Sequence, residues 1–264
     1  MRRSLGAARS LSNWAPVLVL GNGAAGAEKQ AIALADALGL PYQVVNIVSG
    51  ALNDAAARWL EMGLSDDNKK ANTETYQHLV SQVLGLNPDS VREPILEPSA
   101  NDTAAVRSFV EGLGLEAGKP LIGMNTGAGG RWLYKQWTKD HQQSFLQLCS
   151  DAGLAVLLLG GPEEVQRHAD LLEFAAGMPV FDGGNHNSYG RFAALIDQCS
   201  VIVTSDSLAV HCAAARKKQA VVLFGPTSSA EIELYGRGAK ITPAGLDCLC
   251  CYLPVCDKDP HCQA

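Results

Sequence analysis

The chain has 264 residues, of which 47% are hydrophobic and 18% charged, enough for one large or two modest globular domains with a buried core. Its formal net charge of −6 gives it no general attraction for nucleic acid or anionic membrane surfaces, so a bound phosphate must be held by a local site. Its 26 glycines and few aromatic residues suit an α/β protein with many tight turns.

The first residues have two interpretations. Arg2, Arg3 and Arg9 precede the short apolar stretch 15–20, an arrangement found in signal and transit peptides. The segment 17–20, followed by Gly21, is more typical of a buried strand that enters a turn. We therefore expect a strand at this position.

A glycine turn then connects this strand to a predicted helix at 28–38 and a second strand at 42–47. The glycines Gly21, Gly23 and Gly26 have the spacing of a dinucleotide-binding turn. Such a site also needs an acidic residue near the end of the second strand to bind a ribose, and Asn46 occupies that place. A plain turn within a βαβ unit is favoured, and a nucleotide-dependent oxidoreductase is the less favoured alternative.

Helical periodicity continues over 55–62 and 71–84, with the polar stretch 65–70 between them. Three prolines fall within 87–102, which predicts a linker, and a short helix follows at 103–113. We expect a shortened N-terminal α/β domain at 15–100, a C-terminal Rossmann-like domain at 118–246 and a cysteine-rich tail at 247–264.

Strands and helices alternate after residue 120. The expected strands are 121–125, 155–159, 179–182, 201–204 and 220–224, and the expected helices are 140–152, 163–176, 189–198 and 207–215. This alternation predicts a parallel sheet covered by helices on both faces. Ligands bind to such sheets at the carboxyl ends of the strands.

The loop after the first of these strands, 125–137, combines small residues with cations. Thr126 and Gly127 belong to a part that lets backbone N–H groups approach an anion closely. Arg131 and Lys135 follow and can neutralise a diphosphate. The alternative is an ordinary turn with solvated cations, which three glycines in one loop make less favoured.

Two further strand ends carry polar residues. Glu163 and Glu164 begin a helix, where they either complement its dipole or accept hydrogen bonds from a ribose. Asp206 and Ser207 are good N-cap residues for another helix, and His211 lies about one turn further along it. Together with the turn 224–227, these loops predict one binding cleft.

The segments 125–137, 160–163, 204–211 and 224–227 occur in the order and spacing of glycosyltransferase family 9, the lipopolysaccharide heptosyltransferases. Segment 230–236 and the cysteine-rich tail also resemble the end of that family. The resemblance implies a GT-B fold with two Rossmann-like domains. It also implies metal-independent transfer of a sugar, heptose from ADP-heptose, to a lipopolysaccharide core or related oligosaccharide or glycolipid acceptor.

The resemblance assigns roles by position. It implies that Lys135 contacts the donor diphosphate and that Glu163 or Glu164 binds the ribose. The residues placed around the phosphates and sugar are Asp206, Ser207, Leu208 and His211, with Thr126 and Gly127 in the first loop. Such a protein is expected in the cytoplasm, in peripheral contact with the inner membrane, without a nucleic-acid partner.

The N-terminal half departs from the family. Members carry an aspartate in the turn after the first strand as the candidate general base, whereas this turn contains Asn22 and no acid before Glu28. Segment 66–72 resembles a part that lies late in the family's acceptor domain, so the front of that domain is shortened or replaced. The general base is therefore unidentified, and a protein that binds nucleotide sugar without turnover is the main alternative.

Five cysteines crowd the tail: Cys248, Cys250, Cys251, Cys256 and Cys262. Three alternatives remain open for them, namely a structural metal site, disulfides, or a reduced and packed tail. Cys149, Cys199 and Cys212 are expected to be buried small hydrophobes. The first half has no cysteine, which favours a cytosolic protein over a secreted disulfide-bonded one.

Overall fold

The structure is a computed structural model of the chain. It describes residues 17–21, 42–46, 54–90, 93–116, 118–253, 255–258 and 261–263. The predicted helix 28–38 and most of the glycine turn that precedes it lie outside the described residues. The chain divides into two compact units, residues 1–61 and 62–264. The three-part division expected from the sequence stays a prediction.

The first unit contains the two expected strands. β1 (Val17–Gly21) and β2 (Tyr42–Asn46) pair in parallel, with Val17 opposite Tyr42 and Gly21 opposite Asn46. A parallel pair needs a crossover connection, as the predicted βαβ unit provides. The helix α2 (Asp54–Leu64) begins in this unit and ends in the second.

The second unit opens with helices, two of which lie close to the helices predicted at 71–84 and 103–113. The helices are α3 (Asp66–Ala71), α4 (Tyr76–Val83), the 3-10 helix η2 (Pro88–Ser90) and α5 (Ala100–Glu111). The polar stretch 65–70 forms most of α3 because the Ser65 hydroxyl caps its first turn, accepting from the Asn68 N–H at 3.4 Å. Lys69 also pairs with Asp66 at 2.8 Å, so polar residues alone sustain this short helix.

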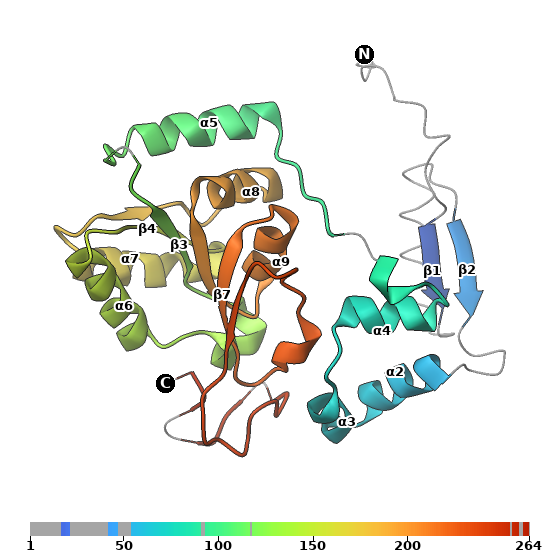
Figure 1. Ribbon diagram of the computed structural model, residues 1–264. Helices are drawn as coiled ribbons and strands as arrows, with labels where there is room; N and C mark the ends of the chain where they lie inside the picture. The colour runs from blue at the N-terminus through green and yellow to red at the C-terminus, as the bar shows by residue number, and fades with distance from the viewer. Residues whose placement is uncertain are drawn as a thin grey trace, which may run out of the picture. The chain divides into compact units, whose positions relative to one another are not determined.

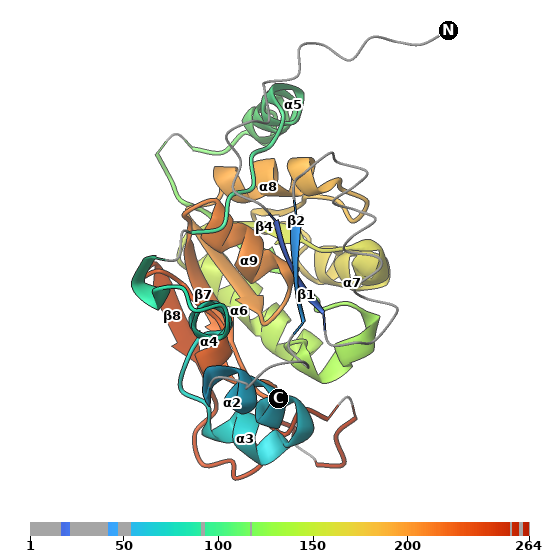
Figure 2. The same cartoon turned by 90° about the vertical axis from the view of Figure 1, so that its right-hand side faces the viewer.

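The rest of the second unit is a six-stranded parallel sheet in the order β5-β4-β3-β6-β7-β8 (Figures 1 and 2). The strands are β3 (Leu121–Asn125), β4 (Ala155–Leu159), β5 (Val180–Asp182), β6 (Val201–Ser205), β7 (Gln219–Leu223) and β8 (Gly238–Ile241). The α-helices between them are α6 (Lys139–Asp151), α7 (Val165–Phe174), α8 (Tyr189–Gln198) and α9 (Leu208–Ala215). The expected α/β fold is confirmed.

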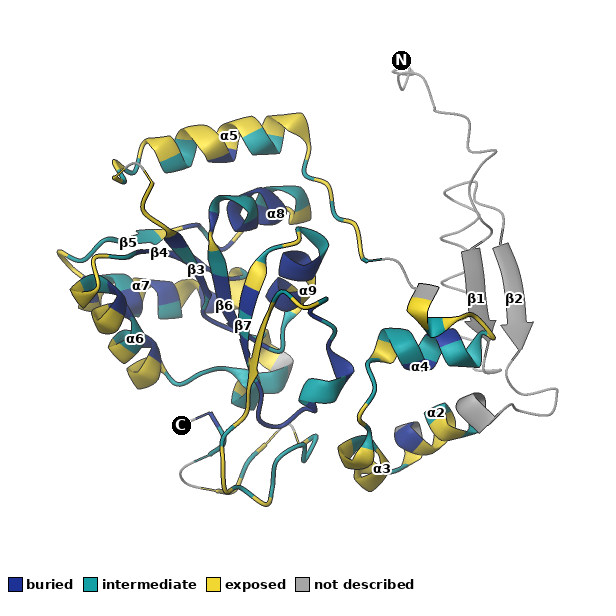
Figure 3. Cartoon of the chain, viewed as in Figure 1, coloured by how far each residue is buried: buried dark blue, intermediate teal, exposed yellow. Residues whose placement is uncertain are grey.

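Helices cover both faces of this sheet and enclose two apolar cores. One core joins the strands to α5, α8 and α9, with Leu157, Leu195 and Val210 fully buried. The other joins the opposite face to α6 and α7 through Leu158 and Leu171. Figure 3 shows the buried residues concentrated in the sheet and in the helix surfaces that face it. Burying each such side chain contributes about 1.5–3 kcal/mol.

Besides α3 and η2, the sequence does not predict β8 or the other short 3-10 helices. β8, at the edge of the sheet in Figure 2, is exposed along its whole length and lacks the apolar run that marks the other strands. The 3-10 helices η3 (Gly130–Lys135), η4 (Pro162–Glu164) and η5 (Ser229–Glu231) follow the carboxyl ends of β3, β4 and β7. Such short turns have no periodic sequence signal, because they complete hardly more than one or two turns.

The strand order creates a switch point at the centre of the sheet. From β3 the chain moves outward to β4 and β5, and it then returns to the other side of β3 to form β6, β7 and β8. The loops after β3 and β6 therefore leave the sheet in opposite directions. A crevice for ligands forms at such a point, outside the carboxyl ends of the strands.

Candidate functional site

A cavity of about 610 Å³ lies at this switch point, within the range that small-molecule sites occupy. Four chain segments line it: 125–129 after β3, 160–164 after β4, 185–192 at the start of α8, and 207–209 at the start of α9. Three of these segments are strand-end loops, and the fourth precedes α8. Three of the loops predicted to form one cleft therefore line this cavity, whereas the turn 224–227 does not.

Asn125 joins the two strands of the switch point. Its side-chain N–H groups donate to the Gly127 carbonyl at 2.6 Å and to the Ser207 hydroxyl at 3.2 Å. The loop after β3 is thereby tied to the start of α9. Asn125 belongs to the predicted loop, but the sequence does not show that it contacts Ser207.

Ser207, and not Asp206, caps α9. The Ser207 hydroxyl accepts from the Ala209 N–H at 3.3 Å, and it hydrogen-bonds the Thr204 hydroxyl at 3.0 Å. Leu208 and Ala209 line the cavity beside it. The first backbone N–H groups of a helix have no carbonyl partner within that helix, so this end of α9 favours an anion.

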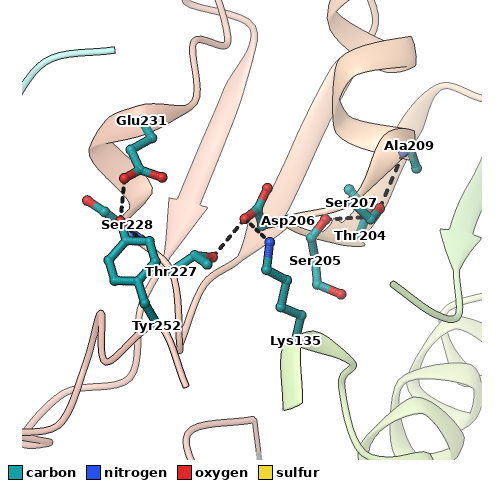
Figure 4. Close-up of polar contacts among 10 residues, drawn as sticks. All are labelled: Lys135, Thr204, Ser205, Asp206, Ser207, Ala209, Thr227, Ser228, Glu231 and Tyr252. Carbon is teal, nitrogen blue, oxygen red and sulfur yellow. Dashed lines mark hydrogen bonds and ion pairs between the residues drawn. The ribbon is translucent and has the colours of Figure 1, made fainter. Parts of the chain in front are cut away.

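Asp206 points away from the cap and joins two other loops (Figure 4). Its Oδ2 accepts from the Lys135 ammonium and from the Thr227 hydroxyl, both at 2.7 Å. The side chains of Lys135 and Asp206 are only 15% and 13% exposed, and the Lys135 ammonium lies 5.3 Å from the centre of the Trp132 ring. A lysine charge is thus held, largely shielded from solvent, immediately beside the amino end of α9.

The two glutamates predicted to bind a ribose have different environments. Glu164 is buried, and its carboxylate accepts from the Gly161 N–H at 2.7 Å and from the Gly129 N–H at 3.4 Å. It therefore links the loops after β3 and β4. A side chain at Gly127 would collide with this carboxylate, which explains the glycine. Glu163 also lines the cavity but is exposed.

One end of the cavity is aromatic. Phe192 is buried and Tyr189 is 70% exposed, and both line the cavity near Asn185 and Asn187. The Asn187 amide donates to the Gly183 and Gly184 carbonyls at 3.1 and 2.8 Å, which fixes the turn before α8. Aromatic faces of this kind stack on planar rings. The sequence does not predict a role for Tyr189 and Phe192, because an aromatic residue near a helix start is more often part of the core.

Four predicted site residues do not line the cavity: the paired Lys135 and Asp206, and also Thr126 and His211. Thr126 is buried, and its hydroxyl turns toward the Leu159 carbonyl at 3.4 Å and not toward the cavity. His211 lies in α9 and is exposed, and it does not line the cavity. Their predicted roles in donor binding stay predictions.

The cysteine-rich tail packs against the loop after β7. The Cys250 N–H donates to the Gly225 carbonyl at 2.9 Å and the Tyr252 N–H donates to the Pro226 carbonyl at 2.8 Å. The tail cysteines are free thiols, and burial raises the pKa of Cys262 to about 11. Among the described residues, no group of three or more His, Cys, Asp or Glu side chains is arranged to hold a metal ion.

In the part of the chain that the structure describes, no helix combines the length and the apolar character needed to cross a membrane.

The sequence matches the model of the family described as "Glycosyltransferase family 9 (heptosyltransferase)" over residues 49–259. The chain is 26% identical over 178 residues to lipooligosaccharide heptosyltransferase 2 of Haemophilus influenzae, covering 60% of this chain and 50% of that protein. It is 26% identical over 183 residues to lipopolysaccharide heptosyltransferase 2 of Escherichia coli, covering 64% and 52%. The chain therefore spans about half the length of the curated relatives it matches.

Solved structures share the fold. The structure of E. coli ADP-heptose lipopolysaccharide heptosyltransferase II aligns with a TM-score of 0.57 at 20% identity, over 86% of this chain and 68% of that one. A family 9 glycosyltransferase from Veillonella parvula aligns with a TM-score of 0.55 at 20% identity, over 64% and 50%.

The fold is an α/β fold with a parallel sheet, and its cavity lies at the topological switch point. Because the family match covers most of its length, the chain belongs to glycosyltransferase family 9, the heptosyltransferases. The family and the GT-B-like fold expected from the sequence are confirmed.

Proposed function

We propose that this protein binds a nucleoside-diphosphate sugar, ADP-heptose or a close relative, and transfers its sugar to a hydroxyl of a lipopolysaccharide core or a related glycolipid. The observation that carries the proposal is the Lys135–Asp206 pair beside the amino end of α9, whose first residues line the cavity of this family 9 chain. A cation beside the amino end of a helix favours a diphosphate.

The donor fits the cavity in one orientation. The diphosphate lies between the backbone amides of 207–209 and the loop 127–129, where Lys135 can neutralise it. The base occupies the aromatic end, against Tyr189 and Phe192, and Glu163 accepts hydrogen bonds from the ribose hydroxyls. This orientation places the anionic diphosphate near the Lys135 cation and the planar base beside an apolar surface.

The chemistry follows from this placement. The acceptor oxygen bonds to the anomeric carbon of the sugar while the bond from that carbon to the diphosphate oxygen breaks. The leaving nucleoside diphosphate gains negative charge, which Lys135 and the helix amides stabilise because they are already oriented. The protein acts in the cytoplasm, and its glycolipid acceptor brings it into peripheral contact with the inner membrane.

A second candidate is a protein that binds the donor without transferring the sugar. The turn after β1 favours it, because that turn lacks the acidic residue that the family resemblance implies as the base. A nucleotide-dependent oxidoreductase is less favoured, because β2 ends at Asn46 and not at a carboxylate.

Thermal unfolding of the full chain with ADP-heptose, UDP-glucose or NAD distinguishes a nucleotide-sugar site from an oxidoreductase site, and ADP release in the presence of a core acceptor distinguishes transfer from binding alone. A ligand at 100 times its dissociation constant stabilises the folded state by about 2.7 kcal/mol. We expect ADP-heptose to raise the melting temperature by several degrees and NAD to leave it unchanged. Stabilisation by NAD alone would contradict the proposal, as would the absence of any shift with ADP-heptose.

A further inference from the structure

A buried glutamate, Glu231, lies four residues after Thr227, which bonds Asp206 of the Lys135–Asp206 pair. Glu231 ends η5, after β7, and is only 6% exposed. The hydroxyls of Tyr252, from the tail, and of Tyr76, from α4, both donate hydrogen bonds to its carboxylate. We call Glu231, Tyr76 and Tyr252 the acid–phenol cluster.

The acid–phenol cluster is held rigidly. The Tyr252 hydroxyl also accepts from the Ser228 N–H at 3.2 Å, and the backbone N–H of Tyr252 donates to the Pro226 carbonyl at 2.8 Å. The Lys69 ammonium lies 4.8 Å from the centre of the Tyr252 ring. Ordered side chains of this kind hold a hydrogen-bonded proton at a defined place.

The cluster is electrostatically coupled to the Lys135–Asp206 pair. The Thr227 hydroxyl, four residues before Glu231, donates to the Asp206 carboxylate. Figure 4 shows Thr227 between the carboxylates of Asp206 and Glu231. The pKa of Glu231 is raised, mainly by burial and to a smaller extent by the Asp206 charge. The hydrogen bonds from Tyr252 and Tyr76 and the Lys135 charge act in the opposite direction. The carboxyl therefore accepts a proton more readily than an exposed glutamate.

The two phenols remain protonated. Burial and the hydrogen bond to Glu231 raise the pKa of both Tyr76 and Tyr252 well above the usual tyrosine value. Tyr76 is 36% exposed, whereas Glu231 is only 6% exposed. Tyr76 is therefore the more accessible of these two residues.

We propose that Glu231 is the final proton acceptor of the transfer reaction and that Tyr76 relays the proton to it. This inference rests on the proposed function. As the acceptor oxygen bonds to the anomeric carbon and the diphosphate leaves, the acceptor proton passes to the Tyr76 oxygen. The phenolic proton of Tyr76 passes at the same time to Glu231, which later releases it to water.

This arrangement supplies the base that the first glycine turn lacks. Asp206 already accepts two hydrogen bonds at one oxygen, including one from an ammonium group. Among its described partners Glu231 has no ammonium or guanidinium group bonded to it, and Thr227, which donates to Asp206, lies four residues before Glu231.

The test compares wild type with Glu231→Gln and Tyr76→Phe, using ADP-heptose as donor and both heptose-deficient lipopolysaccharide core and water as acceptors. The rate of ADP release gives kcat and KM, and calorimetry gives the donor Kd. We expect Glu231→Gln to lower kcat at least 100-fold and Tyr76→Phe at least 10-fold, with the donor Kd changed less than twofold.

Matched controls lie in the same segment. Glu233→Gln removes a carboxylate two residues away that bonds only the Tyr235 N–H among its described partners, at 2.7 Å. Tyr235→Phe removes a buried hydroxyl that has no hydrogen-bond partner among the described residues. Both are expected to keep kcat within threefold of wild type.

The dependence of kcat on pH separates proton transfer from a structural role. The titratable or charged groups that influence Glu231 are Tyr76, Tyr252, Asp206, Lys135 and Cys250. Wild type should lose kcat as pH falls and Glu231 becomes protonated, and Glu231→Gln should lack this acid limb. An unchanged kcat in Glu231→Gln, or an acid limb that persists in it, would overturn the inference.

Two further results have distinct meanings. A wild type that binds ADP-heptose but releases no ADP with either acceptor would overturn the relay together with the transfer step of the proposed function, and would favour the second candidate. A wild type that does not bind ADP-heptose would instead overturn the proposed function, on which the relay depends.

Discussion

Lys135 and Asp206 are 71 residues apart in the chain, yet their charged atoms lie 2.7 Å apart beside the cavity. A pair this shielded is costly to break, because the remaining charge loses its partner. A bound diphosphate offers Lys135 a second anion, so the lysine charge contributes directly to donor affinity in the proposed function.

We expect Lys135→Ala to weaken ADP-heptose binding at least tenfold, about 1.4 kcal/mol. Lys135→Arg should lose less affinity, because it keeps the charge. Isothermal titration calorimetry measures both values. Lys119→Ala is the control, since Lys119 pairs only with the exposed Glu116 among its described partners. Equal affinities for Lys135→Ala and Lys135→Arg would show that the lysine charge does not contact the donor.

Glu163 and Glu164 are adjacent but should behave differently. Glu164→Ala leaves the Gly161 N–H and the Gly129 N–H without their acceptor, which costs about 1–3 kcal/mol of unfolding free energy and loosens both loops. Glu163→Ala removes only an exposed carboxylate at the cavity wall. We expect both variants to bind donor more weakly and only Glu164→Ala to melt at lower temperature. A lower melting temperature for Glu163→Ala alone would reverse these assignments.

At this scale the sequence predicts the kinds of residue in the site better than their contacts. Helix-capping propensity makes Asp206 and Ser207 equal candidates, and only the fold shows Ser207 as the cap and Asp206 bonded to Lys135 and Thr227. Glu231 lies in segment 230–236, which resembles the end of the family, but the residue pattern there gives neither Glu231 nor Glu233 a chemical role. The importance of Glu231 depends on tyrosines from two distant segments.

The strands and helices of the sheet follow closely from the periodicity of the sequence. Apolar runs such as 155–159 are buried on both faces, so they stand out as strands, and α8 has the predicted bounds 189–198. Elements without an apolar signature were missed or misplaced. β8 is exposed at the edge of the sheet, and α3 is a polar helix held by a serine cap and an ion pair.

The packing of η5 against the tail should make stability depend on pH. Because burial raises the pKa of Glu231, this carboxyl adds stability that is complete below its unfolded-state pKa and is lost as pH rises through the folded value. We expect the unfolding free energy of wild type, relative to Glu231→Gln, to fall as pH rises from the ordinary glutamate value of 4.5. Urea unfolding at a series of pH values measures this difference, with Glu233→Gln as control. A difference that rises with pH would contradict the burial effect.

For the molecule as a whole, the charge distribution explains why the site must be local. A chain with a net charge of −6 repels a nucleoside diphosphate sugar in general, so the partly shielded Lys135 and the amides at the start of α9 must attract it. The cytoplasmic location and the membrane contact stay predictions at this scale. The family, by contrast, could be recognised from the order of four strand-end motifs, because their spacing reflects the shared sheet.

A crystal structure of the full chain grown with ADP-heptose would show where the donor binds. We expect density for the diphosphate between the amides of 207–209 and the loop 127–129, on the side of Lys135, with the base against Tyr189 and Phe192. Nucleotide density at the glycine turn after β1, with the cavity between β3 and β6 empty, would contradict this expectation.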